Sequence, residues 1–161
     1  MALGDFQYLD ISTTQLNGAK KANVAAAATA ILAGEPVARA LGAATVTQMA
    51  TNKPVVATDF LVGIATSNST QTASLAGTVD YMPLQMGVQY LVNPKVPATW
   101  ATQALYNALV GARVLIDLTS GAFTALAADG ATNGAVVVNL DLARYPGKVA
   151  IAFRNGVSDL S

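Results

Sequence analysis

The stretch of residues 59–92 constrains the fold most, because short apolar runs alternate there with polar turns. Residues 60–65 are apolar, and residues 75–84 are rich in side chains that favour strands. A Ser/Thr/Asn-rich turn separates these two runs, and residues 86–92 form another apolar run. Short strands separated by turns about every ten residues are typical of a β-sandwich or a small β-barrel. We therefore predict a mainly β fold.

The same pattern of apolar runs and turns extends to both sides of this stretch. The Ala-rich residues 24–33 favour helix by composition, but Gly34 and Pro36 interrupt the run, and the residue before a proline avoids helical geometry. We therefore prefer strands here as well. The expected strands outside the central stretch are residues 24–32, 36–41, 45–50, 54–57, 113–118, 122–127, 135–140 and 148–153.

Residues 99–110 depart from this pattern and predict one short inserted helix. Thr99 is a suitable N-cap for it, and Gly111 is a suitable stop. Leu105 and Leu109 are four positions apart and Trp100 lies on much the same side, which gives the helix one apolar side. Its aromatic residues are expected to cover one end of the barrel.

The chain of 161 residues is long enough for one domain with a real core. We expect an extended N-terminal arm at residues 1–23, a β-barrel body at residues 24–153 and a polar tail at residues 154–161. The arm is either a frayed terminus or a segment that docks on its own body or on a neighbour. The second interpretation draws on four large apolar side chains placed close together: Phe6, Tyr8, Leu9 and Ile11.

Charge is scarce, since charged residues make up 11% of the chain against about 25% in typical soluble domains. Such a surface has few charges to desolvate, which suits packing against other subunits; the alternative is a chain with small side chains everywhere. Nine basic and nine acidic residues cancel, and Lys20-Lys21 is the only adjacent basic pair, so nucleic-acid binding is not expected. The longest apolar run, residues 24–33, is far shorter than the about 20 residues of a membrane-spanning helix, so no membrane partner is expected.

The sequence contains neither Cys nor His, which removes thiolates, imidazole bases and the usual zinc ligands. Glu35 is the only Glu, and we expect it to be an exposed turn residue. The Asp residues beside predicted strands are expected to be solvated or to cap turns: Asp59, Asp80, Asp117 and Asp141. We therefore predict no enzymatic activity, no catalytic residue, no bound metal and no cofactor.

Several short motifs follow one another in a recognisable order between residues 30 and 153. They are Ala33-Gly34-Glu35-Pro36-Val37, Val62-Gly63-Ile64-Ala65, residues 77–84, residues 110–115 and residues 121–125. This order resembles that of phage head decoration proteins, also called capsid cement proteins. The longer arm, the helix-like segment and the tail depart from that pattern.

The resemblance implies a small β-barrel protein on the outer surface of a tailed-phage head, made in the host cytoplasm. It further implies a homotrimer that binds the major capsid protein without enzymatic activity and stabilises the expanded shell. The residues that we expect at a capsid or subunit interface are Phe6, Tyr8, Leu9, Ile11, Trp100 and Tyr106. The alternatives are another virion structural protein, such as a tail-tube or head-completion subunit, and a carbohydrate-binding or adhesin module with Trp100 and neighbouring Tyr residues as its platform.

Overall fold

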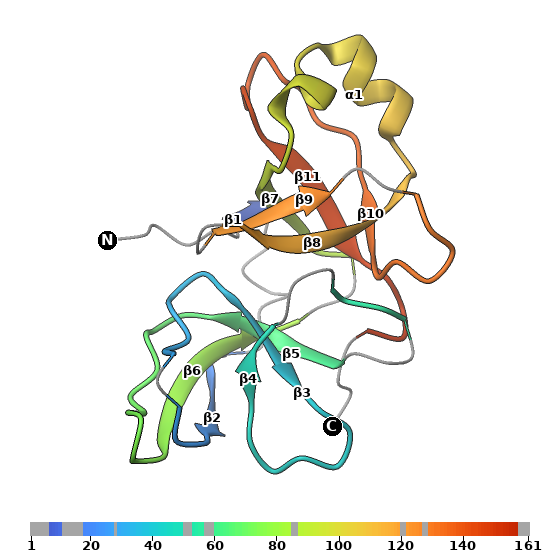
Figure 1. The fold of residues 1–161 in the computed structure, drawn as a ribbon. Coiled ribbons are helices and arrows are strands. Elements are labelled where there is room, and N and C mark those ends of the chain that lie inside the picture. The colour runs from blue at the N-terminus through green and yellow to red at the C-terminus, as the bar shows by residue number, and fades with distance from the viewer. Residues whose placement is uncertain are drawn as a thin grey trace.

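The structure is a computed structural model that describes residues 7–10, 18–27, 29–49, 53–56, 60–84, 87–119, 122–126 and 129–157. It contains two β-sheets, one of six strands and one of five, which lie one above the other in Figure 1. One short α-helix and one 3-10 turn interrupt the strands. The predicted mainly β fold with a short inserted helix is confirmed.

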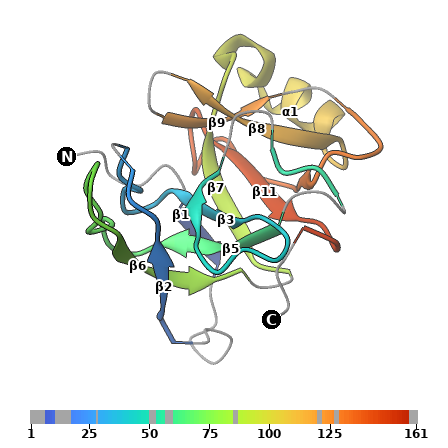
Figure 2. The same cartoon turned by 60° about the horizontal axis from the view of Figure 1, so that its bottom comes forward.

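The five-stranded sheet, called the lower sheet here, closes almost completely on itself. Its order is β2 (Lys20–Val24), β6 (Gly77–Pro83), β5 (Phe60–Ala65), β3 (Pro36–Arg39) and β4 (Thr47–Gln48). All neighbouring strands are antiparallel. An isolated parallel bridge joins Val24, at the end of β2, to Val46, the residue directly before β4. Figure 2 brings these strands forward. The strands and the β2–β3 connection form a small core of their own, which includes Val37 and Val79 from the strands and Ile31 from the connection.

The six-stranded sheet, called the upper sheet here, contains a ring of five paired strands. Its order is β1 (Gln7–Asp10), β7 (Gln89–Pro94), β11 (Val149–Phe153), β10 (Ala135–Val137), β8 (Arg113–Thr119) and β9 (Ala122–Leu126). The C-terminal part of β7 pairs in parallel with β9, which closes the ring. β1 is added along the first half of β7. The turn η1 (Pro97–Trp100) and helix α1 (Gln103–Leu109) connect β7 to β8 above this sheet (Figure 1).

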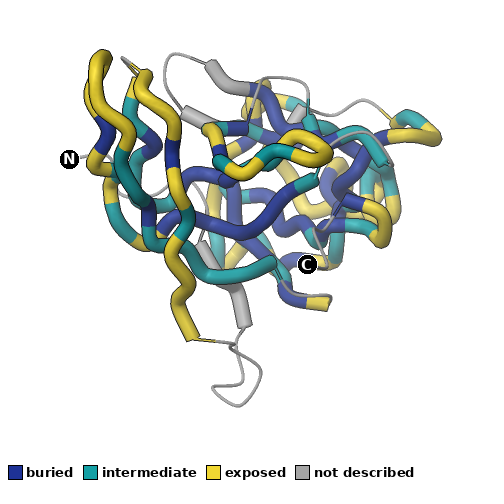
Figure 3. The backbone as a smooth tube through the Cα atoms, turned by 90° about the horizontal axis from the view of Figure 1, so that it is seen from below, coloured by how far each residue is buried: buried dark blue, intermediate teal, exposed yellow. Residues whose placement is uncertain are grey.

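The two sheets share the larger of two apolar cores. The cluster built mainly by the upper sheet also includes residues of the lower half of the molecule. These are Leu61 and Ile64 in β5, and Met49 directly after β4. The Leu61 N–H also donates to the carbonyl of Val157, 2.7 Å away, which ties the chain after β11 to β5. Figure 3 shows the buried segments gathered in the middle and the exposed loops around them. The sheets are therefore two halves of one packed body.

Parts of the predicted arm and tail belong to this body. β1 lies within residues 1–23 and all of β2 but its last residue does too, and each pairs with a strand of the body. Arg154 at the start of the predicted tail donates from Nη1 to the carbonyls of Ala131 and Asn133, and Val157 is buried.

The predicted strand at residues 24–32 is wrong, because β2 ends where that strand was expected to begin. Side chains of the β5–β6 connection replace strand partners in this segment. The Ile31 N–H donates to Ser69 Oγ at 2.7 Å, and the Ala33 N–H donates to Asn68 Oδ1 at 2.9 Å. Residues 54–57 also form no strand among the described positions, where only isolated bridges at Lys53 and Val55 occur.

An exposed ion pair fixes the entry to β8. Arg113 donates from Nε to Asp129 Oδ1 at 3.0 Å and from Nη2 to Oδ2 at 3.1 Å, and its backbone N–H donates to Oδ1 as well. The pKa of Asp129 is lowered to about 2, mainly by the hydrogen bonds from the Arg113 side chain and next by the one from its backbone.

We expect Asp129→Asn to remove part of the acid sensitivity of the fold. The ionised Asp129 stabilises the folded state above its unfolded pKa of about 4, and this stabilisation is lost as the pH falls toward 2. Melting temperatures between pH 6 and pH 2 should therefore fall less in the variant than in the wild-type protein. Asp141→Asn keeps the Arg113–Asp129 contacts and should retain the wild-type loss; equal slopes in all three proteins would contradict the assignment.

Gly63 in β5 provides a second test, because a side chain has no room there. An added Cβ would collide with the carbonyl oxygen of Met82 and lie 2.7 Å from Cδ2 of Tyr81 in the neighbouring strand. Gly63→Ala should lower the free energy of unfolding by about 1–3 kcal/mol, the usual cost of overpacking, as measured by urea denaturation. Gly18→Ala, with no heavy atom within 4 Å of the added carbon, is the control and should be near neutral.

Candidate functional site

The connection between β7 and β8 is a segment without charged residues, called the helical cap here and defined as residues 96–112. This segment contains no Asp, Glu, Lys or Arg. It nevertheless exposes large apolar side chains, with Val96 52%, Leu105 47% and Val110 42% exposed. Protein-binding surfaces combine exposed apolar side chains with few charges, and the residues of the helical cap have both properties.

Two buried aromatic residues hold the helical cap on the upper sheet. The rings of Trp100 and Tyr106 lie 5.7 Å apart and tilted by 58°, and both are buried. The Tyr106 hydroxyl donates to the carbonyl of Val138 at 2.8 Å and accepts from the Ala150 N–H at 2.9 Å. Burial raises the pKa of Tyr106, and the hydrogen bond from Ala150 offsets part of that rise. Tyr106 is therefore a neutral anchor that joins α1 to β11.

Backbone groups and a side-chain amide fix the two ends of α1. Thr102 is the N-cap, and its side chain accepts from the Leu105 N–H. Gln103 donates from Nε2 to the carbonyl of Leu140 and accepts at Oε1 from the Leu142 N–H, both at 2.9 Å. Beyond the helix, Gly111 has a φ of 87°, which glycine adopts without strain. The helical cap is thus held by contacts along its whole length.

The structure corrects the predicted helix in two ways. The helix begins at Gln103 and not at Thr99, because η1 occupies the preceding residues, and Thr102 caps it. Tyr106 lies in the core and Leu105 is exposed, whereas an apolar side built from Leu105, Leu109 and Trp100 was expected. Gly111 does follow the helix as predicted.

The predicted interface residues fall into three groups. Trp100 and Tyr106 lie in the core, so a surface contact through either would require the fold to open. Tyr8 and Leu9 lie in β1, which pairs with β7 of the same chain. Phe6 and Ile11 lie outside the described residues. The burial of Trp100 also removes the sugar-stacking platform on which the carbohydrate-binding alternative depended.

The carboxylates serve the fold, and Glu35 does so from the interior. It is only 2% exposed, and its Oε2 accepts from the Leu32 N–H and from Gln48 Nε2, both at 2.8 Å. The prediction of an exposed turn residue is therefore wrong, because the carboxylate satisfies the donors of a buried turn. Asp117 is also buried and pairs with Lys95, so the expectation of a solvated residue is wrong for it too.

The remaining Asp residues are closer to expectation. Asp80 is partly buried and pairs with Lys21 at 3.5 Å. Asp141 caps a turn by accepting from the Ala143 N–H at 2.9 Å. Asp59 lies outside the described residues.

Comparisons with protein-family models, with curated proteins and with solved structures each found no match. Within the described part of the chain, no helix has the length and apolar character needed to cross a membrane. No group of three or more His, Cys, Asp and Glu residues comes together to hold a metal ion among those same residues.

The predicted interface set did not include the exposed residues of the helical cap. Val96, Leu105 and Val110 carry no catalytic or ligand chemistry that a motif search would notice. One signal was present, because residues 96–112 lack any charge. Which of the apolar side chains in that segment are exposed depended on where the helix begins.

Tyr106→Phe tests the anchor of the helical cap. The substitution leaves the buried Ala150 N–H without its acceptor, so the free energy of unfolding at pH 7 should fall by about 1–3 kcal/mol. The pKa of Tyr106 is raised in the folded state, so the stabilisation from the neutral phenol is present below pH 10 and lost as the pH rises beyond it. The difference between wild type and variant should therefore shrink between pH 9 and pH 11 in urea unfolding. Tyr145→Phe, at a half-buried position, is the control. It should leave the free energy of unfolding close to that of the wild type at pH 7 and at high pH.

Proposed function

We propose that this protein is a non-enzymatic decoration protein of a tailed-phage head. It binds the outer surface of the assembled head, contacts the major capsid protein and stabilises the shell. The observation that carries this proposal is the helical cap, which presents Val96, Leu105 and Val110 on an uncharged segment above a rigid β body. The order of short motifs along the chain supports the same function.

The chemistry of the helical cap suits burial against another protein. Burying a charge costs free energy unless the charge is paired, and the cores of protein interfaces are accordingly depleted in charged residues. A partner that covers α1 desolvates the exposed glutamine, alanine, leucine and asparagine side chains of the helix, none of which is charged. A decorating subunit can therefore gain affinity from a small contact.

The way the helical cap is held also favours binding. Tyr106 and Gln103 link α1 to β11 and to the segment after β10, so the backbone of the cap is ordered before a partner arrives. Preordered surfaces lose less conformational entropy on association than flexible ones do. On a capsid the same contact repeats many times, and in a homotrimer each subunit would add avidity to the others.

The N-terminal segment is a second proposed contact. Phe6, Tyr8, Leu9 and Ile11 would extend the interface to the capsid or to a neighbouring subunit of the trimer. β1 pairs with β7 on one edge, so removing residues 1–16 would take a strand from the upper sheet. Single substitutions of Phe6 and Ile11 to alanine are therefore a cleaner test of the segment than truncation.

Binding to purified heads tests the proposal. Expanded heads that lack the protein are mixed with the purified wild-type chain, and bound protein is measured by co-sedimentation, with its position determined by electron cryomicroscopy. We expect saturable binding to the outer surface, and at least about tenfold weaker binding, or 1.4 kcal/mol, for the double variant Leu105→Asp/Val110→Asp. Leu41→Asp is the matched control, because Leu41 is 86% exposed in the β3–β4 connection, away from the helical cap.

The outcomes separate the protein classes. Absence of wild-type binding to expanded heads would refute decoration, and binding confined to tails would indicate another virion structural protein. If the double variant remains folded by circular dichroism and binds heads at full occupancy, the helical cap is not the contact surface. Light scattering of the free protein measures whether it is a trimer.

A further inference from the structure

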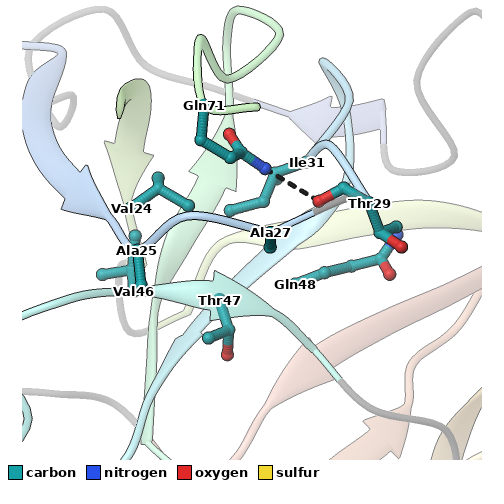
Figure 4. Close-up of a pocket in the computed structure, with 9 residues that line it drawn as sticks. All are labelled: Val24, Ala25, Ala27, Thr29, Ile31, Val46, Thr47, Gln48 and Gln71. Atoms are coloured by element: carbon teal, nitrogen blue, oxygen red, sulfur yellow. Dashed lines mark hydrogen bonds between the residues drawn. The ribbon is translucent and has the colours of Figure 1, made fainter. Parts of the chain in front are cut away.

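An apolar pocket with a cavity volume of about 200 Å³ opens in the lower sheet, beside the seam where its first and last strands meet (Figure 4). Val24 and Val46 form this seam through their parallel bridge, and the Val46 N–H donates to the carbonyl of Asn23 at 2.8 Å. β4 has only two residues, so the pairing stops here, and the pocket lies between β4 and the chain at Ala25, Ala27 and Thr29. Val24, Ile31 and Val46 give the pocket apolar walls of the lower core.

Gln71 brings a polar group to this apolar space. Its side chain is only 8% exposed and reaches from the β5–β6 connection toward Thr29, where Nε2 donates to the carbonyl at 2.7 Å (Figure 4). Because the acceptor is a carbonyl, this bond identifies the nitrogen of the amide and leaves Oε1 as the other atom. Oε1 is buried and has no hydrogen-bond partner among the described residues. A buried acceptor without a donor is costly, so the site favours a ligand that supplies one.

The backbone around Gln71 is fixed before any ligand arrives. The Thr70 N–H donates to the carbonyl of Thr78, and the Ala27 N–H donates to the carbonyl of Thr72. Gly77 packs so closely that an added Cβ would lie 2.7 Å from the Cα of Gln71. The backbone that carries Gln71 is thus held beside the pocket by the fold, so a movement of its amide is a change in side-chain torsions alone.

We propose that this pocket binds a ring-sized, uncharged apolar group that carries one hydrogen-bond donor, the chemistry shared by free indole and a tryptophan side chain. Apolar cavities of about 150 Å³ accommodate benzene, so the size suits one aromatic ring system. None of the described lining residues is charged. An indole N–H donates and does not accept, which matches an amide oxygen that has no hydrogen-bond partner among the described residues.

Binding must be accompanied by a small adjustment of Gln71, since Oε1 is covered in this structure. The amide turns its oxygen toward the pocket, and the aromatic ring packs against Val24, Ile31 and Val46. The side-chain NH2 resonance of Gln71 therefore reports binding directly. No covalent step and no charge transfer is involved.

Titration of the full chain with indole and with indene tests the proposal, because indene has the same shape and a CH2 group in place of the N–H. Binding is followed by 1H–15N NMR, including the Gln71 side-chain resonance. We expect indole to bind at least about tenfold more tightly than indene and to shift the Gln71 NH2 signal. Equal affinities for indole and indene would overturn the proposal. So would the absence of any shift of the Gln71 NH2 signal when each probe is added up to its solubility limit.

Two variants locate the site. Ala27→Leu fills the pocket from its exposed rim and should abolish binding of both probes. Gln71→Leu removes the acceptor and should make the affinities for indole and indene equal. Ala104→Leu introduces the same side chain as Ala27→Leu on exposed α1 and should bind indole as the wild type does. Indole binding that survives Ala27→Leu would place the ligand elsewhere and overturn the proposal.

A third probe distinguishes the sources of the indole group. A short uncharged peptide with one central tryptophan is titrated alongside free indole. Binding of the peptide with the same Gln71 shift indicates a tryptophan side chain of a partner protein, whereas binding of indole alone indicates a small molecule. Both results require the pocket, and the wild-type comparison of indole with indene decides whether the pocket is a site at all.

Discussion

The double burial of β5 is the constraint on which the rest of the structure depends. Leu61 and Ile64 belong to the core shared with the upper sheet, while Val62 and Ala65 belong to the core of the lower sheet. One short strand therefore serves two apolar clusters, and it has no face left for solvent. This explains why residues 60–65 are continuously apolar and do not alternate with polar residues, and why Gly63 stands where β6 approaches most closely.

Each sheet curls so that few of its strand edges remain unpaired. In the upper sheet β7 pairs with β11 on one side and with β1 and β9 on the other, so most of its backbone groups are used inside the chain. In the lower sheet the bridge between Val24 and Val46 joins the outer strands. Curled sheets with few open edges resist the edge-to-edge association that exposed strands invite. Contacts with other molecules then depend on what lies above or between the strands.

Two such places emerge, and they differ in their chemistry. The helical cap stands above the upper sheet and exposes apolar side chains on a segment without charges, which suits a broad protein contact. The pocket lies at the seam of the lower sheet and combines apolar walls with the single unpaired oxygen of Gln71, which suits a small group with one donor. The scarcity of charge along the whole chain favours both, because neither site requires a charge to be desolvated.

The sequence by itself determined the mainly β class, the strands around residues 60–65 and 149–153 and the presence of one helix before Gly111, because local apolar runs, turns and glycine positions encode them. Only the tertiary structure decided the roles of Glu35, Leu105 and Tyr106. Glu35 is buried because donors from Leu32 and Gln48 meet at one carboxylate, and Gln48 comes from a different strand. Tyr106 is the anchor and Leu105 an exposed residue because the Tyr106 hydroxyl meets backbone groups of Val138 and Ala150, which come from distant segments. Contacts between distant segments set burial and hydrogen bonding, and no local pattern carries that information.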